Sequence, residues 1–342
     1  MKFLHKSVTV QSDTGCFFRN RISCGNRDKT DRKEALLSGQ GFFYLRNRWG
    51  GREDCRHNPG NPHSGFLIAL EARNMEHKTG LEDYYVIRGQ KKMRFGYTTG
   101  SCAAAACKGA CLMLLGKEKL TSVPLMTPKG ILLDLELHDI QISENQVTCA
   151  VKKDAGDDPD TTNGILVYAT VWKTDTAGIV IDGGAGVGRV TRPGLSQKVG
   201  EAAINPVPRQ MIEKEIRRCV GDVGAEVEIS IPGGDKLAAR TFNPRIGIEG
   251  GLSILGTSGI VRPMSESAVV ESLKTCLSVA AAAKPEYICF VLGETGEHRM
   301  REWLTARGKM TEHVEFVQVS NYVGLMLDEA LRLNVEKILI GG

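Results

Sequence analysis

The stretch FNPRIGIEGGLSILGTSGIVRPMSES, residues 242–267, combines bare backbone with cationic side chains. It holds five glycines, although strands avoid glycine because it costs conformational entropy and adds no packing. Such bare backbone can line a ligand site, with polar groups beside it; the alternative is that the glycines let two domains pack closely. The expected lining residues are Asn243, Arg245, Gly250, Gly251, Thr257, Ser258 and Arg262.

A second glycine-rich stretch, VIDGGAGVGRV (180–190), has the spacing D-x-G-x-G-x-G. Such a loop holds S-adenosylmethionine in doubly wound methyltransferases, because glycines let backbone amides approach the ligand closely. The loop normally follows a strand and opens a helix, but Pro193 and β-branched residues follow here, so no immediate helix is expected. A glycine-rich turn is the alternative. The candidate donor-binding residues are Asp182, Gly184, Gly186 and Gly188.

The stretch KKDAGDDPDTTNG (152–164) places four aspartates within seven residues. These carboxylates repel one another unless cations or hydrogen-bond donors satisfy them. A solvated turn, a metal loop and the lining of a polar ligand site are the alternatives, and the spacing is not that of an EF-hand. The candidate catalytic carboxylates are Asp154, Asp157 and Asp158.

Two Asn-Pro corners each carry an arginine, in AINPVPR and FNPRIG. Proline fixes φ and asparagine bonds nearby backbone, so each corner is a stiff mount for a guanidinium group that binds carboxylates. Turn chemistry alone is the alternative. Arg209 joins the candidate substrate-binding residues on this ground, and Arg192 of VTRPGL is a further candidate.

The composition is that of a globular protein, with 42% hydrophobic and 25% charged residues. No stretch reaches the ~18–20 apolar residues of a membrane helix, and no signal peptide is recognisable, so we expect a cytoplasmic protein with no membrane partner. The net charge of +4 comes from residues 1–74, which hold 13 basic against 7 acidic residues. Aromatic and basic residues do not interleave there, so no nucleic-acid partner is expected.

The ten cysteines show neither C-x-x-C spacing nor a zinc pattern with histidine, so we expect no protein-bound metal. Cys102, Cys107 and Cys111 lie among small residues, as in a closely packed helix. A catalytic thiol would need an activating histidine, and none is placed for that role.

The residue patterns divide the chain into three parts. Residues 1–74 show no periodicity and read as a disordered or non-native extension, with Met75 as a sensible start. Residues 81–265 mix a helix at 98–116, a helix entered through prolines at 205–221 and several strands, which indicates an α+β domain with a mostly non-parallel sheet. From 266 to 342 helices and strands alternate, which predicts a smaller parallel α/β domain that ends early, on a strand.

Several strings together resemble the cobalt-precorrin-5B C(1)-methyltransferases of the anaerobic cobalamin pathway. They are RFGYTTGSCAAAA, KKDAGDDPDTTNG, GAGVGRVTRPGL, AINPVPR, the stretch 242–267 and VSNYVGLMLDEA. The resemblance runs from about Tyr84 to the last residue, and nothing before Met75 belongs to it. It implies methyl transfer from S-adenosylmethionine to ring carbon 1 of cobalt-precorrin-5B, giving cobalt-precorrin-6A.

The same resemblance implies an α+β domain similar to domain 2 of ribosomal protein S5 in permuted form, followed by a small parallel α/β domain. The substrate carries the cobalt, and S-adenosylmethionine is the co-substrate. The rival readings are a non-catalytic tetrapyrrole carrier and a small-molecule kinase of S5-like fold, although no Gly-Lys-Ser/Thr phosphate loop occurs. If the donor does not bind the 182–188 loop, LGETGEH (292–298) opens the next candidate region.

Overall fold

The computed structural model describes residues 20–21, 34–37, 43–46, 77–116, 118–174, 178–221, 224–310 and 312–341. The chain divides into two compact units, Met1–Glu76 and His77–Gly342. In the first, β1 (Asn20–Arg21), β2 (Glu34–Leu37) and β3 (Phe43–Arg46) form an antiparallel sheet. The remaining residues of the predicted extension, and the expected start at Met75, lie outside the described residues.

A five-stranded sheet is the centre of the second unit, with the order β12-β14-β11-β10-β9. Its strands are β9 (His138–Ile142), β10 (Gln146–Lys152), β11 (Leu166–Thr174), β12 (Ile179–Gly183) and β14 (Gly224–Ser230). Only the β12–β14 pair is parallel. The expected mixed α and β architecture with a mostly non-parallel sheet is therefore present.

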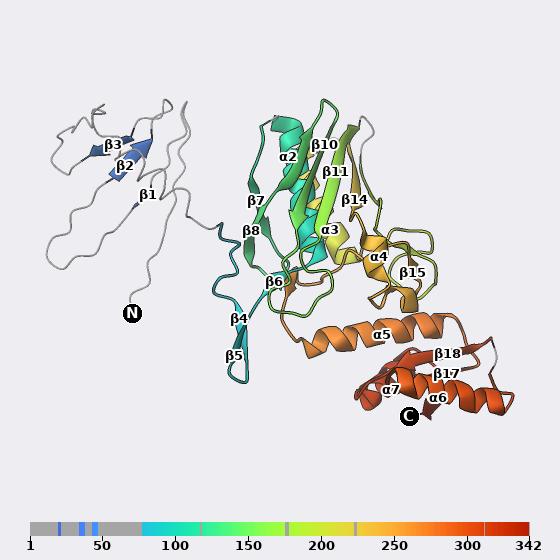
Figure 1. Ribbon diagram of the computed structural model, residues 1–342. Helices are drawn as coiled ribbons and strands as arrows, with labels where there is room; N and C mark the ends of the chain where they lie inside the picture. Colours follow the sequence, from blue (N-terminus) through green and yellow to red (C-terminus); the bar gives the residue numbers. More distant parts are fainter. Residues whose placement is uncertain are drawn as a thin grey trace. The chain divides into compact units, whose positions relative to one another are not determined.

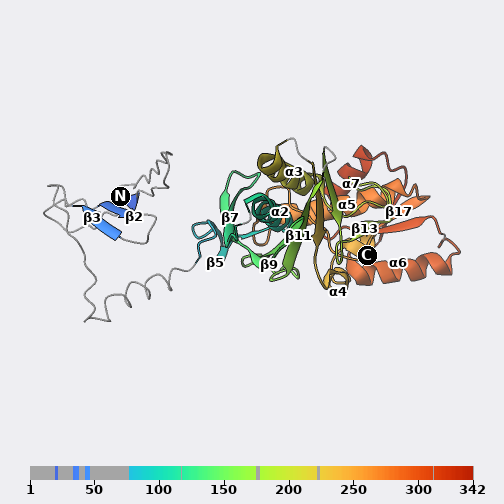
Figure 2. The ribbon, with the colours of Figure 1, turned by 90° about the horizontal axis from the view of Figure 1, so that it is seen from above.

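Helix α2 (Thr99–Gly116) packs on β10 and β11, and α3 (Pro206–Val220) packs on α2. Viewed from above, α2 lies between this sheet and strand β7 (Ser122–Met126) (Figure 2). Alanines and cysteines make α2 thin enough to be enclosed, and most of its residues are buried. Within the described ranges it is the one helix long and apolar enough to cross a membrane, and here it forms core.

Shorter elements surround this core. They are β4 (Tyr85–Arg88) with β5 (Lys91–Arg94), β6 (Gly96–Tyr97) with β16 (Ile260–Val261), β7 with β8 (Leu132–Glu136), β13 (Arg189–Val190) with β15 (Ile248–Glu249), helix α4 (Gly234–Ala238) and the 3₁₀ helix η1 (Asn243–Ile246). All four pairs are antiparallel: β4–β5 and β7–β8 are hairpins, whereas β6–β16 and β13–β15 join segments far apart in sequence.

The C-terminal part is a parallel three-stranded sheet with the order β18-β17-β19. Its elements are α5 (Glu266–Ala282), β17 (Tyr287–Val291), α6 (Gly293–Ala306), β18 (Val314–Gln318), α7 (Val323–Arg332) and β19 (Ile338–Gly341). Helix α5 runs between this sheet and the rest of the unit (Figure 1). The predicted alternation of helices and strands is present.

The two faces of the parallel sheet are covered by different helices. Leu277 of α5 and Met326 of α7 pack with Phe290 on one face. Leu304 of α6 packs with Val291 on the other. The largest core cluster takes its buried residues from Leu81 to Ile260, so the predicted domain boundary after residue 265 falls between clusters, although His77–Gly342 forms one compact unit.

Candidate functional site

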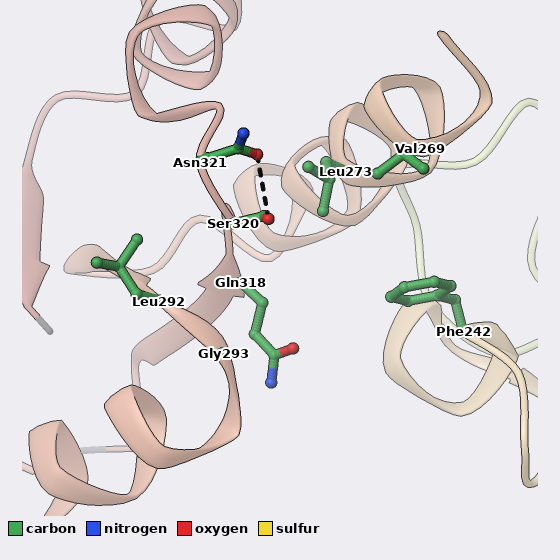
Figure 3. A pocket seen from close by; sticks show the side chains of 8 residues that line it. All are labelled: Phe242, Val269, Leu273, Leu292, Gly293, Gln318, Ser320 and Asn321. Carbon is green, nitrogen blue, oxygen red and sulfur yellow. Dashed lines mark hydrogen bonds between the residues drawn. The ribbon is translucent and has the colours of Figure 1, made fainter. Parts of the chain in front are cut away.

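A cavity with a volume of about 620 Å³ opens outside the carboxyl ends of β17 and β18. Side chains of α5 form one wall, and residues that follow the two strands form the other (Figure 3). The lining residues are Phe242, Val269, Leu273, Leu292, Gly293, Gln318, Ser320 and Asn321.

Polar groups gather at one side of this cavity. The Ser320 hydroxyl donates to Asn321 Oδ1 over 3.3 Å (Figure 3), and Gln318 Nε2 donates to Glu297 Oε2 over 3.2 Å. Ser320 has φ of 51°, in the left-handed region that a serine rarely adopts. Such conformations cluster at binding sites, where surrounding structure holds them.

The predicted donor loop follows β12, as expected, and no helix follows it: the chain continues into β13. Asp182 is bound by Arg189 through two hydrogen bonds of 2.7 and 2.9 Å. The Arg189 guanidinium lowers the pKa of the Asp182 carboxyl below its ordinary value, so this carboxylate is ionised and already paired.

The glycines of this loop are closely packed by other segments of the chain. A Cβ on Gly186 would lie 1.9 Å from the carbonyl oxygen of Ile231, and one on Gly188 would lie 2.4 Å from Cγ2 of Ile248. The Gly188 amide donates to Leu252 O over 2.9 Å. Asp182 and Ala185 of this loop are exposed, whereas Gly188 is buried where other segments of the chain meet it. The donor-binding role of Asp182, Gly184, Gly186 and Gly188 stays a prediction.

Gly251 and Asn243 belong to the same crowded junction. A Cβ on Gly251 would lie 2.2 Å from Gly186 O, so the two glycine-rich stretches are in contact. The buried Asn243 amide donates to Gly251 O over 3.0 Å and its Oδ1 accepts from Ser253 Oγ over 3.2 Å. Gly250 is exposed, with φ of 78° and free space beside it. Gly250 alone of these positions offers bare backbone to a ligand.

The acidic loop is satisfied by this chain's own groups. Asp154 makes two hydrogen bonds to the Arg94 guanidinium, of 2.5 and 3.0 Å. Burial alone would raise the pKa of Asp154, but Arg94 and the Gly156 amide outweigh it and lower the pKa. Asp157 accepts from the Arg94 amide over 2.6 Å, and Asp158 from the Met264 amide over 2.9 Å.

These contacts bring the acidic loop to the end of the stretch 242–267. Arg262 and Thr257 are exposed there, and Ser258 Oγ donates to Ile260 O over 2.9 Å. The Asp158 contact to Met264 therefore places the acidic loop beside the end of the stretch 242–267.

Three of the four predicted arginines have partners within the chain. Arg192 pairs with Glu315 over 2.5 Å, Arg245 pairs with Glu294 over 3.0 Å, and Arg209 donates to Ile181 O over 2.8 Å. Within the residues described, Arg262 is the predicted arginine that is exposed without such a contact.

The cysteines of α2 are unsuited to nucleophilic chemistry. Burial raises the pKa of Cys102 to about 12 and raises that of Cys107 well above its ordinary value. Neutral thiols of this kind are poor nucleophiles. Across the described ranges, no three His, Cys, Asp or Glu side chains gather as a metal site would require.

Sequence reasoning missed most of the cavity residues. Phe242 heads the stretch that we singled out, and Leu292 opens the second candidate region, but neither was assigned a role. The sequence did carry a signal for this cavity, because Leu292 and Ser320 each follow a strand of the predicted parallel sheet. Ligands commonly bind at the carboxyl ends of such strands.

Comparison with known proteins agrees with the family resemblance. A family model named CbiD matches residues 86–263. The cobalt-precorrin-5B C(1)-methyltransferase of Alkaliphilus metalliredigens is 50% identical over 260 residues, covering 75% of this chain and 67% of the relative. The enzyme of that name from Thermoanaerobacter sp. is 44% identical over 262 residues, covering 76% of this chain and 70% of the relative.

A crystal structure of a cobalamin biosynthesis protein (cbiD) from Archaeoglobus fulgidus is 29% identical, covers 77% of this chain and 80% of that chain, and superimposes with a TM-score of 0.41. This chain spans about two thirds of the length of the curated relatives it matches. On the family match and the identity to these relatives, the chain belongs to the CbiD family.

Proposed function

We propose that this chain transfers a methyl group from S-adenosylmethionine to ring carbon 1 of cobalt-precorrin-5B, giving cobalt-precorrin-6A in cobalamin biosynthesis. The observation that supports this most strongly is the 50% identity over 260 residues to a relative named for that reaction. The alternatives, a tetrapyrrole carrier and a kinase, have no comparable support.

The reaction depends on positioning the two substrates more than on covalent catalysis by the protein. The ring carbon attacks the methyl carbon, the carbon–sulfur bond breaks, and its electron pair leaves with sulfur as S-adenosylhomocysteine. Aligning the three atoms and excluding water supplies most of the acceleration in such a transfer. Cobalt enters as part of the substrate, and no metal held by the protein is needed.

A carboxylate serves as proton acceptor in this proposal. Asp154 is ionised and so can accept a proton, but its Arg94 partner lowers its pKa and makes it a weaker base than an unpaired carboxylate. Asp157 and Asp158 are beside it, each bonded to a backbone amide. The acidic loop adjoins the end of the stretch 242–267, where the ring would lie.

The corrinoid fringe of acetate and propionate groups would bind exposed cations. Arg262 is the best placed of the four arginines, because it is exposed and no intrachain partner occupies it in the described structure. Gly250, Thr257 and Ser258 supply low-profile backbone and hydroxyl groups nearby in the chain. Arg192 and Arg245 would bind substrate only by exchanging their present carboxylate partners.

We also propose that residues 81–265 form a permuted relative of ribosomal protein S5 domain 2, and that the protein acts in the cytoplasm. The five-stranded, largely antiparallel sheet covered by α2 and α3 is compatible with the first proposal.

A transfer assay distinguishes the functions. With methyl-tritiated donor and cobalt-precorrin-5B, the protein should move tritium into the corrinoid and release S-adenosylhomocysteine. A carrier would bind the corrinoid without transfer, and a kinase would consume ATP. Either of those results, with no tritium in the corrinoid, would contradict the proposed function.

A further inference from the structure

We infer that the methyl donor binds with its adenosyl group in the cavity outside β17 and β18, and not on the loop that follows β12. This inference rests on the proposed function and names the site that the function needs. The lining residues come from α5, from Phe242 just before η1, from the end of β18 and from the segments after the two strands.

The topology of the sheet places a crevice at this point. After β17 the chain enters α6 on one face, and after the neighbouring β18 it enters α7 on the opposite face. The strand order also reverses here, because β19 returns to the far side of β17. In open α/β sheets, ligands bind outside the carboxyl ends of the strands at such a switch point.

The apolar lining suits a nucleoside base. Leu292, Val269 and Phe242 are large apolar side chains that remain 53%, 47% and 48% exposed around this hollow. Apolar groups gathered at a cavity mark a binding site more often than scattered ones do. The volume of about 620 Å³ falls within the ~300–1,000 Å³ range of small-molecule pockets.

The absence of charge on the lining selects between the two substrates. None of the eight lining residues carries a formal charge. A corrinoid with an acidic fringe needs cations, whereas adenosine is neutral and needs an apolar slot with a few amides. Gln318 and Asn321 supply those amides. The donor is therefore the substrate that fits.

The start of α6 suits the carboxylate of the donor's amino-acid portion. Helix α6 begins at Gly293 without a side-chain cap, so its first-turn amides have no partner within the helix. Helix N-termini attract carboxylates. Gly293 has φ of 78° and open space where a Cβ would lie, so this backbone is accessible from the cavity that it lines.

In the loop that follows β12, the groups that would bind the donor already have partners within the chain. The Gly184 and Gly188 amides donate to Ile229 O over 2.8 Å and to Leu252 O over 2.9 Å. Arg189 already binds the Asp182 carboxylate. A donor bound there would have to break contacts that hold the fold together.

The test fills the cavity without touching the core. Val269 is exposed and outside the buried clusters, so Val269→Trp should block the slot while leaving the melting temperature unchanged. The matched control is Leu331→Trp on α7, a 77% exposed apolar position away from the lining. Calorimetry with S-adenosylhomocysteine should show at least tenfold weaker binding for Val269→Trp and normal binding for the control.

A second variant removes a contact without adding bulk. Asn321→Ala should weaken S-adenosylhomocysteine binding several-fold by loss of a hydrogen bond. Normal affinity in both cavity variants would overturn the inference, and so would normal binding by Val269→Trp beside weakened binding by Asp182→Asn. If the unaltered protein binds S-adenosylhomocysteine in this cavity but transfers no methyl group, the proposed function fails and the site inference stands.

Discussion

Arg192 and Glu315 form an ion pair of 2.5 Å between residues 123 positions apart in the chain. Arg192 follows β13, and Glu315 lies in β18, so the pair joins the parallel sheet to the rest of the unit. The Arg192 side chain also packs against Gly247, where a Cβ would lie 2.5 Å from it. An arginine that sequence reasoning assigned to substrate therefore has a structural contact.

We predict that this pair stabilises the fold. A double-mutant cycle with Arg192→Ala and Glu315→Ala should give a coupling energy of about 0.5–3 kcal/mol, because both side chains are largely shielded from water. The control is the exposed helical pair Arg217 and Glu213, for which about 0.3–0.5 kcal/mol is typical. Urea unfolding measures both, and a coupling for Arg192 no larger than the control would contradict the structural role.

Gly186→Ala should destabilise the protein more than Gly250→Ala does. Both glycines have positive φ, 73° and 78°, so alanine at either position costs about 1–2 kcal/mol in strain. Only at Gly186 would the added Cβ also collide with backbone, at Ile231. Melting curves of the two variants isolate the collision. Equal losses would mean that the loop is not packed as described.

Asp154→Asn should lower stability at neutral pH and have less effect in acid. The folded-state pKa of Asp154 is depressed, so its ionised form contributes stability above the unfolded value of about 3.9. That contribution is lost as the pH falls through the lower folded value. Melting temperatures between pH 7 and pH 3 check this, with Glu144→Gln at an exposed turn as control. A difference that stays constant with pH would contradict it.

Arg262→Ala should weaken corrinoid binding about tenfold to a hundredfold, the effect of ~1.5–3 kcal/mol for one charged hydrogen bond. Binding of S-adenosylhomocysteine should not change. Lys214→Ala, at an exposed position of α3, removes a charge elsewhere and serves as the control. Unaltered corrinoid affinity in Arg262→Ala would remove this arginine from the substrate site.

Local patterns predicted the elements well. The small residues between caps at 98–116 became α2, and Pro206 and Pro208 lie in the first turn of α3, because both signals act within a few residues. The β-branched residues and Pro193 after Gly188 correctly excluded a helix there.

The site was less predictable because its contacts are long-range. Nothing near Gly186 in sequence indicates that the carbonyl of Ile231 fills the space beside it, and nothing near Arg192 indicates Glu315. Phe242, Val269 and Leu292 meet only once α5 packs beneath η1 and the parallel sheet forms. Glycine patterns alone do not distinguish packing against a ligand from packing against backbone.

The central claim is methyl transfer to ring carbon 1. It is tested most directly by following an isotope-labelled methyl group from the donor into the corrinoid. The protein is incubated with donor carrying ¹³C in its methyl group and with cobalt-precorrin-5B, and the product is examined by mass spectrometry and carbon NMR. We predict one labelled methyl group per ring, attached at carbon 1, with S-adenosylhomocysteine formed in equal amount. A label on another ring carbon, or no label in the corrinoid, would contradict the account.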